Sequence, residues 1–132
     1  MSQENVEIVR SAVDAFNRRD WDAWIAMCHE DGQLYSLRSQ LEGRPYTGKE
    51  GLRRFTADQD EEWDYVRLEA LKFRDAGEWV VVLCDFKARG SASGVELEFP
   101  VGVVFATREG KVSYGRFFSD RAEALEAVGL SE

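Results

Sequence analysis

The sequence predicts a single α+β domain organised around one long strand near the C-terminal end of the chain. Over 95–105 apolar residues occupy every second position, the pattern of a strand with one apolar face. Pro100 and Gly102 interrupt this strand, so we expect it to bend. Glu109-Gly110 is a near relative of an Asp-Gly hairpin turn and predicts a partner strand over 111–118. Helical patterns come first in the chain, and helices covered by a curved sheet usually enclose a cavity.

Two helices are predicted at the N-terminal end. Apolar residues recur at helical spacing over 6–16, and this first helix ends near Asn17. Asp20 is a good cap for a second helix, whose apolar stripe covers 21–28. His29, the only histidine of the chain, follows this stripe. A histidine at a helix C-terminus is favoured by the negative end of the helix dipole, so we expect capping rather than general-base catalysis.

The middle of the chain predicts a short strand, a loop and a third helix. Residues 34–37 favour the strand and 38–46 the loop. The third helix begins at 47–50, which has the Thr-x-x-Glu form of a capping box, and continues into the acidic residues of 58–62, expected to be a solvated face. The remaining elements are predicted over 63–73 and 79–88, both strands, and over 120–127, a helix that ends before Gly129.

Composition argues against several classes of function. The chain has 132 residues, 44% of them hydrophobic, which suits one domain with one core. Its net charge of −8 argues against nucleic acid and membrane surfaces as partners, because both need a basic patch. Cys28 and Cys84 have no metal-ligand spacing, so we expect neither a metal nor a cofactor. The polar N-terminus and the lack of a long apolar run predict a cytoplasmic protein.

Several stretches carry a resemblance to a known family: MSQENVEIVR (1–10), AFNRRDWDA (15–23), YTGKEGLRRF (46–55), DAG (75–77), REGKV (108–112) and DRAEALEA (120–127). With the order of elements, they resemble the SnoaL-like branch of the nuclear transport factor 2-like superfamily. The resemblance covers 1–132 and implies a cone-shaped single domain, with N-terminal helices packed in the concave face of a strongly curved, mostly antiparallel β-sheet. It also implies a pocket inside the cone and often a homodimer through the outer sheet face, but no activity.

Several members of this superfamily are enzymes, and their catalytic positions can be carried over one by one. The general-base Asp of ketosteroid isomerases falls on Ser36, and their oxyanion-hole Tyr and acid fall near Ala12 and Val103. These residues supply neither a tuned base nor donors for an enolate oxygen. The acid of SnoaL-type polyketide cyclases falls on Phe117, with no acid at either neighbouring position. The usual catalytic acids of the family are therefore missing.

Limonene epoxide hydrolases use an Asp-Arg-Asp arrangement, for which Asp85, Arg89 and Arg116 are the nearest candidates. Strand alternation places Asp85 opposite the face of Val80, Val82, Cys84 and Phe86. We therefore expect Asp85 to form an outer-face salt bridge rather than to act in catalysis.

Inside the cone we expect an apolar ligand pocket. By resemblance, the last strand points Ser113, Gly115 and Phe117 inward. Such small groups deepen the pocket unless another side chain, such as Trp24 or Trp63, fills the space. The residues predicted to bind the ligand are Trp24, Leu34, Ser36, Phe55, Trp63, Cys84, Phe86, Val103, Phe105, Ser113, Gly115 and Phe117.

Two further groups of residues are expected outside this pocket. On the outer sheet face, Tyr114 and Phe118 indicate either an interface or a covering helix or loop. At the expected mouth of the cone lies a cluster that suits either recognition of a carboxylate or phenol or ordinary loop chemistry, namely Tyr35, Arg38, Arg44 and Tyr46.

Three functions remain open. The first is a dimeric domain that binds a small apolar molecule, and the apolar inward face favours it. The second is an enzyme, an isomerase, polyketide cyclase or epoxide hydrolase with an atypical acid/base set. The third is a protein-interaction module that uses the surface of the fold.

Overall fold

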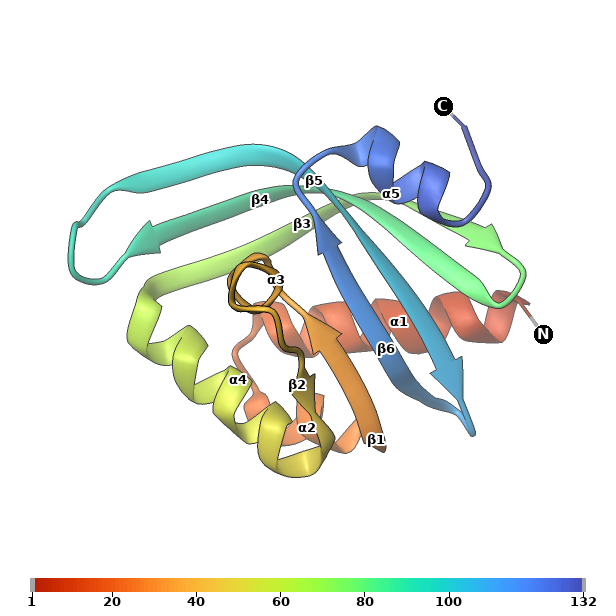
Figure 1. Cartoon of the computed structure of the whole chain (residues 1–132), viewed down its shortest axis with the longest axis horizontal. Helices are drawn as coiled ribbons and strands as arrows, with labels where there is room; N and C mark the ends of the chain where they lie inside the picture. Colours follow the sequence, from red (N-terminus) through yellow and green to blue (C-terminus); the bar gives the residue numbers. More distant parts are fainter. Residues whose placement is uncertain (1, 132) are drawn as a thin grey trace.

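The computed structural model describes residues 2–131 and shows a single α+β domain in which helices pack against one curved sheet (Figure 1). Within these residues the sheet has six strands in the order β2-β1-β6-β5-β4-β3. The predicted fold class is confirmed. The elements are α1 (Ser2–Asn17), α2 (Trp21–Ala26), β1 (Cys28–Tyr35), α3 (Leu37–Glu42), β2 (Tyr46–Thr47), α4 (Gly48–Glu62), β3 (Trp63–Ala76), β4 (Trp79–Gly90), β5 (Glu96–Arg108), β6 (Lys111–Phe118) and α5 (Arg121–Ala127).

The sheet is mostly antiparallel. Strands β3, β4, β5 and β6 pair in sequence as antiparallel neighbours, whereas β1 joins β6 in parallel. The β4–β5 ladder runs from Trp79 opposite Ala106 to Arg89 opposite Glu96. Figure 1 shows β3, β4 and β5 arching over the helices. The predicted long strand with Pro100 and Gly102 is thus β5, at the middle of a curved sheet.

Polar side chains fasten the N-terminal helices to the edge of the sheet. Asn17, the last residue of α1, donates from Nδ2 to the Leu68 carbonyl and accepts the Leu68 N–H at Oδ1, both at 2.8 Å. It therefore pairs with the edge strand β3 as a strand backbone would. Arg19 donates to the carbonyls of Gln59 and Trp63 at 3.3 and 3.1 Å. This cation satisfies carbonyls at the C-terminal end of α4 and holds that helix beside α1 and α2.

Helix α5 covers the outer face of the sheet with a small core of its own, made by Val81, Val104, Ala124 and Leu125. The contact is close at Gly102, where a Cβ atom would lie 2.5 Å from the Ala124 Cβ. Asp85 lies on this face, as the alternation predicted, and its Oδ1 is 2.8 Å from Arg121 Nη2 on α5. The outer face is therefore partly covered by a helix, and the partner of Asp85 comes from that helix.

The structure corrects the start of β1, which begins at Cys28 rather than at residue 34. Cys28 pairs with Val112 of β6, and the next pair along the ladder joins Gln33 to Tyr114. The intervening residues 29–32 bulge out of the ladder. Because bulged residues do not alternate between two faces, the local sequence lacked a strand pattern.

The expected loop at 38–46 also contains a helix, α3. Ser36 caps it, because its Oγ accepts the Ser39 N–H at 3.1 Å, and Gly43 ends it with a φ of 80°. The capping box expected at 47–50 is only half correct. Thr47 is the N-cap residue of α4, but its side chain makes no capping hydrogen bond.

Candidate functional site

A cavity of about 160 Å³ lies between the helices and the concave face of the sheet. Its wall combines α1, α2 and α4 with the inward faces of several strands, and most of it is aliphatic or aromatic. The lining residues are Ala12, Val13, Phe16, Trp24, Leu34, Tyr35, Ser36, Leu37, Arg38, Tyr46, Phe55, Gln59, Glu62, Trp63, Leu68, Phe86, Val103, Phe105, Gly115, Arg116 and Phe117.

Aromatic rings form two groups in this wall. Phe55 on α4 is stacked on Trp24, with ring centroids 5.3 Å apart, and meets Tyr46 edge-on at 5.3 Å. Across the sheet side, Phe86 meets Phe117 edge-on at 5.6 Å. Such rings have few rotamers and hold one another in place. The cavity is therefore apolar and largely preformed.

Most of the residues predicted for the pocket line this cavity, namely Trp24, Leu34, Ser36, Phe55, Trp63, Phe86, Val103, Phe105, Gly115 and Phe117. Cys84 and Ser113 do not. Cys84 belongs to the inward core but has no exposed surface, because neighbouring side chains cover it completely. Neither residue is therefore part of the cavity wall.

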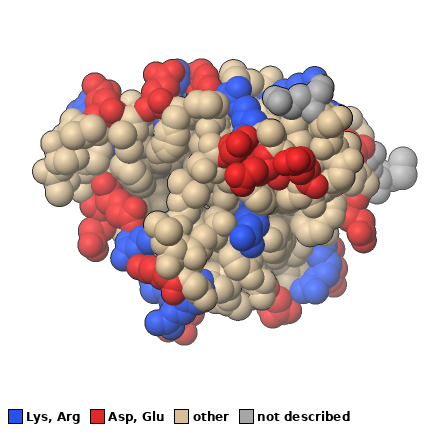
Figure 2. Space-filling model, turned by 45° about the horizontal axis from the view of Figure 1, so that its top comes forward, with Lys and Arg blue, Asp and Glu red and all other residues tan. Residues whose placement is uncertain are grey.

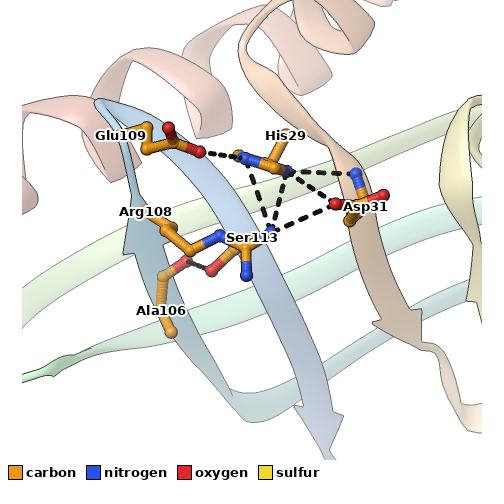
Figure 3. Close-up of polar contacts among 6 residues, drawn as sticks. All are labelled: His29, Asp31, Ala106, Arg108, Glu109 and Ser113. Carbon is orange, nitrogen blue, oxygen red and sulfur yellow. Dashed lines mark hydrogen bonds and ion pairs between the residues drawn. The ribbon is translucent and has the colours of Figure 1, made fainter.

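Ser113 misses the cavity because β6 is not a regular strand there. The β5–β6 ladder passes from Ala106 opposite Tyr114 to Thr107 opposite Val112, so Ser113 is the extra residue of a bulge. Its Oγ donates to the Ala106 carbonyl at 3.3 Å (Figure 3). The strict alternation assumed from the sequence fails at this one residue.

The small residue Gly115 does not deepen the cavity. A Cβ at this position would lie 2.9 Å from Leu34 Cδ2 and 3.4 Å from the Phe105 ring. The space left by the missing side chain is filled by other side chains, which was the alternative to a deeper pocket. The filling side chains are Leu34 and Phe105 rather than a tryptophan.

The charged groups at the rim of the cavity are bound to one another. The Arg38 guanidinium contacts Glu62 and Glu42, the latter at 3.2 Å, and lies 3.9 Å from Asp58. The Tyr46 hydroxyl donates to Asp58 Oδ2 at 2.6 Å. The hydrogen bond to Glu62, followed by that to Glu42, raises the pKa of Arg38, and burial followed by the bond to Asp58 raises the pKa of Tyr46. At neutral pH Arg38 is therefore a cation and Tyr46 a neutral phenol.

This arrangement corrects the reading of 58–62 as a purely solvated face. Asp58 and Glu62 turn toward Tyr46 and Arg38, and Asp60 accepts hydrogen bonds from Arg19 and the Trp21 indole. The acidic run therefore links α4 to the elements around the cavity.

Gln59 is a polar lining residue that the sequence analysis missed. Its side chain is 9% exposed and lines the cavity. Within residues 2–131 its amide group has no hydrogen-bond partner, although its main-chain carbonyl caps α4. A signal was present, because Gln59 follows Leu52 and Phe55 at helical spacing on the buried face of α4.

A separate polar cluster lies where β1 meets the β5–β6 turn (Figure 3). His29 Nδ1 accepts the Asp31 N–H at 3.1 Å, so Nε2 carries the proton and donates to Glu109 Oε1 at 2.6 Å. Arg108 Nη2 lies 3.4 Å from Asp31 Oδ2. His29 therefore belongs to a strand and ties it to a turn, and the expectation that it caps α2 is wrong. None of these four residues lines the cavity.

The two cysteines are buried thiols. Burial raises the pKa of Cys28 and of Cys84 to about 12, so both are protonated at neutral pH. Among residues 2–131 no group of three or more His, Cys, Asp or Glu side chains is placed to hold a metal ion. No described helix is both long enough and apolar enough to cross a membrane. On the face drawn in Figure 2, Lys and Arg are interspersed with Asp and Glu rather than gathered in one patch.

The comparison with known families settles the family. Residues 9–115 match the SnoaL-like domain family, which is most of the chain. The chain belongs to the SnoaL-like domain family. The resemblance drawn from the sequence is thereby confirmed. No curated protein matches this SnoaL-like chain.

Solved structures share the fold of this SnoaL-like protein at low sequence identity. An NTF2-like protein of unknown function from Burkholderia pseudomallei has a TM-score of 0.77 at 21% identity, covering 96% of this chain and 98% of that one. A protein with a ketosteroid isomerase-like fold from Catenulispora acidiphila, in complex with trimethylamine, has a TM-score of 0.75 at 19% sequence identity. The match covers 94% of this chain and 93% of that one. A proposed polyketide cyclase from Xanthomonas campestris has a TM-score of 0.74 at 20% sequence identity. The match covers 97% of this chain and 98% of that one.

The positions carried over from the enzymes of the superfamily do face the cavity of the SnoaL-like domain. All four positions line it: Ala12 on α1, Ser36 just after β1, Val103 on β5 and Phe117 on β6. The mapping thus identified wall positions, and at each of them the residue present has no acid or basic group. The wall is mostly apolar, with the amide of Gln59 in it and the Arg38–Glu62 pair at its rim.

Proposed function

We propose that this SnoaL-like protein binds a small apolar molecule in the cavity between its helices and its sheet. The observation that carries the proposal is the aromatic wall around Phe55 and Phe86, which is built from several elements and encloses about 160 Å³. A cavity of about 150 Å³ in another protein accommodates benzene. The size therefore favours a ligand with one aromatic ring, or two small fused rings, over a steroid-sized one.

A relative supports this use of the fold. The Catenulispora acidiphila protein is a complex with trimethylamine, a small molecule. The predicted pocket residues that line the cavity are, in this proposal, its ligand-binding residues: Trp24, Leu34, Ser36, Phe55, Trp63, Phe86, Val103, Phe105, Gly115 and Phe117.

Thermal melting against a panel of compounds tests the proposal. A ligand that binds only the native state raises the melting temperature by mass action. We expect one- and two-ring aromatics to raise it and steroids to leave it unchanged. Ala12→Leu, which places a larger side chain on the cavity wall, should remove the shift, whereas Ala57→Leu on the exposed side of α4 should retain it. A panel without any shift contradicts the proposal and favours the protein-interaction alternative.

An enzyme is the second candidate, and one observation favours it. Glu62 lines the cavity and is hydrogen-bonded to Arg38, so a carboxylate lies within reach of a bound molecule. A carboxylate beside a bound substrate can act as a general base. Turnover of a ligand found in the melting panel, lost in Glu62→Gln while binding remains, supports this candidate. Unchanged turnover in Glu62→Gln contradicts the assigned role.

A homodimer is a separate part of the proposal, supported by an aromatic row on the outer sheet face. The Tyr114 ring lies 5.5 Å from the rings of both Tyr35 and Trp79, and all three side chains are partly exposed. Trp79 and Phe118 also pack against the cluster under α5. Light scattering at micromolar concentration should give twice the chain mass of 15.0 kDa. A mass of 15.0 kDa contradicts the dimer.

A further inference from the structure

The cavity contains polar groups that its own wall does not satisfy. The Gln59 amide has no hydrogen-bond partner within residues 2–131, although its side chain is only 9% exposed. The Trp24 indole N–H likewise has no partner there, and Trp24 is 6% exposed. Among the described side chains, Arg121 Nε is the one buried nitrogen or oxygen that lacks both a partner and accessible surface. The Gln59 and Trp24 polar atoms therefore keep accessible surface, and both residues line the cavity.

These two groups flank the same ring. Trp24 is stacked on Phe55, and Gln59 follows Phe55 by one helical turn on α4. An unpaired amide in an apolar wall loses hydrogen bonds that it makes in water. A ligand group that pairs with the amide recovers them, whereas a purely apolar ligand displaces water from it and leaves it unpaired. The wall thus favours an apolar ligand that carries a polar group beside Phe55.

The charges nearby indicate which polar group fits. Of the two arginines that line the cavity, Arg116 lies over the rings of Tyr35 and Phe118. The other, Arg38, is already bound to Glu62 and Glu42 and faces Asp58. An anionic ligand would have to displace these carboxylates or approach them closely. A neutral hydroxyl meets neither obstacle. It can donate to Gln59 Oε1 and accept from Nε2, so it uses both halves of the amide.

We propose that the cavity recognises a neutral, hydroxyl-bearing aromatic molecule of one ring, and that Gln59 is the residue that distinguishes it from its hydrocarbon analogue. This inference rests on the proposed ligand-binding function. It goes further by naming the chemical class of the ligand and the side chain that selects it.

A matched set of probes tests the inference by NMR titration of the full-length protein: toluene, p-cresol and 4-methylbenzoate, which differ only in the group opposite the methyl. We expect p-cresol to bind about 10-fold more tightly than toluene, the effect of one net hydrogen bond of about 1.4 kcal/mol. 4-Methylbenzoate should bind more weakly than p-cresol at pH 7. In Gln59→Leu, the affinity for p-cresol should fall about 10-fold, whereas the affinity for toluene should not fall. Gln3→Leu, the same change on an exposed helix position, should leave all three affinities unchanged.

The outcomes separate the two proposals. Equal affinities for p-cresol and toluene in the wild type overturn the role of Gln59 but keep the apolar pocket. Tighter binding of 4-methylbenzoate overturns the neutral-ligand inference and assigns recognition to Arg38. Failure of all three probes to bind overturns the proposed function itself. If Gln59→Leu does not fold, Gln59→Met takes its place, and the ratio of the p-cresol and toluene affinities in the wild type still tests the role of Gln59.

Discussion

His29 Nε2 lies 2.6 Å from Glu109 Oε1, and this hydrogen bond ties the β5–β6 turn to strand β1 (Figure 3). Glu109 has a φ of 55°, a left-handed conformation that is uncommon for a residue other than glycine. The hydrogen bond to His29 is the largest cause that lowers the pKa of Glu109. The turn that closes the central hairpin is therefore held by a titratable contact.

A pH dependence of stability follows from this contact. Because the pKa of Glu109 is lower in the folded than in the unfolded chain, its contribution to stability is present above the ordinary value of 4.5. It is lost as the pH falls through the lowered folded pKa. We expect Glu109→Gln to destabilise the protein at pH 6 to 7 in urea unfolding, and to match the wild type more closely at pH 3.

Glu78→Gln is the control for this experiment, because Glu78 also lies in a hairpin turn but forms no ion pair within residues 2–131. It should change the free energy of unfolding little at any pH. A constant difference between Glu109→Gln and the wild type from pH 3 to 7 would show that the carboxylate charge is not what His29 stabilises.

Gly102→Ala should destabilise the packing of α5 on the sheet. The new Cβ would lie 2.5 Å from the Ala124 Cβ, and neither atom is at the end of a flexible side chain. Overpacking of this kind costs about 1–3 kcal/mol. Ala124→Gly removes the opposing Cβ, so the double variant Gly102→Ala/Ala124→Gly should recover part of the loss. Urea unfolding of the four proteins measures this coupling, and strictly additive losses argue against a direct contact.

Phe117→Ala should change ligand selectivity more than it changes folding. The Phe117 ring is partly exposed, contacts Phe86 and lines the cavity. Its removal should cost about 1–3 kcal/mol, less than for a fully buried phenylalanine. It also enlarges the cavity, so naphthalene should gain affinity relative to toluene. An unchanged affinity ratio, measured by NMR titration, would place the ligand elsewhere.

Cys28 and Cys84 should not react with thiol reagents in the native protein at pH 8. Burial raises the pKa of both thiols to about 12, so the reactive thiolate is scarce. Both should be labelled once urea unfolds the chain, as counted by mass spectrometry. Rapid labelling of Cys84 before unfolding would mean that the inner core near the cavity opens readily.

Residues whose environment is set by regular alternation could be predicted from the sequence. Phe86, Val103 and Phe117 each stand at the alternate positions of their strands that were expected to point inward, and each lines the cavity. Ser113 shows the limit of this reasoning, because a bulge is a property of two strands together and cannot be read from one. The same holds for 29–32, whose bulge concealed most of β1.

Side-chain pairing across distant segments lay beyond the sequence as well. The alternatives for Arg38 included carboxylate recognition, and the structure shows that Glu62, 24 positions away, already pairs with it. In the sequence, Gln59 is one polar residue among several on α4. Its importance depends on which face of the helix is buried and on the lack of a partner, and only the assembled fold shows both.

The most direct test of the central claim uses the four tryptophans as reporters during a titration with toluene, followed by the indole N–H resonances. Trp24 and Trp63 line the cavity, whereas Trp79 lies on the outer face and the Trp21 indole is bound to Asp60. We predict saturable shifts of the Trp24 and Trp63 resonances, with Trp79 unchanged. Equal or absent shifts of all four resonances would contradict ligand binding in this cavity.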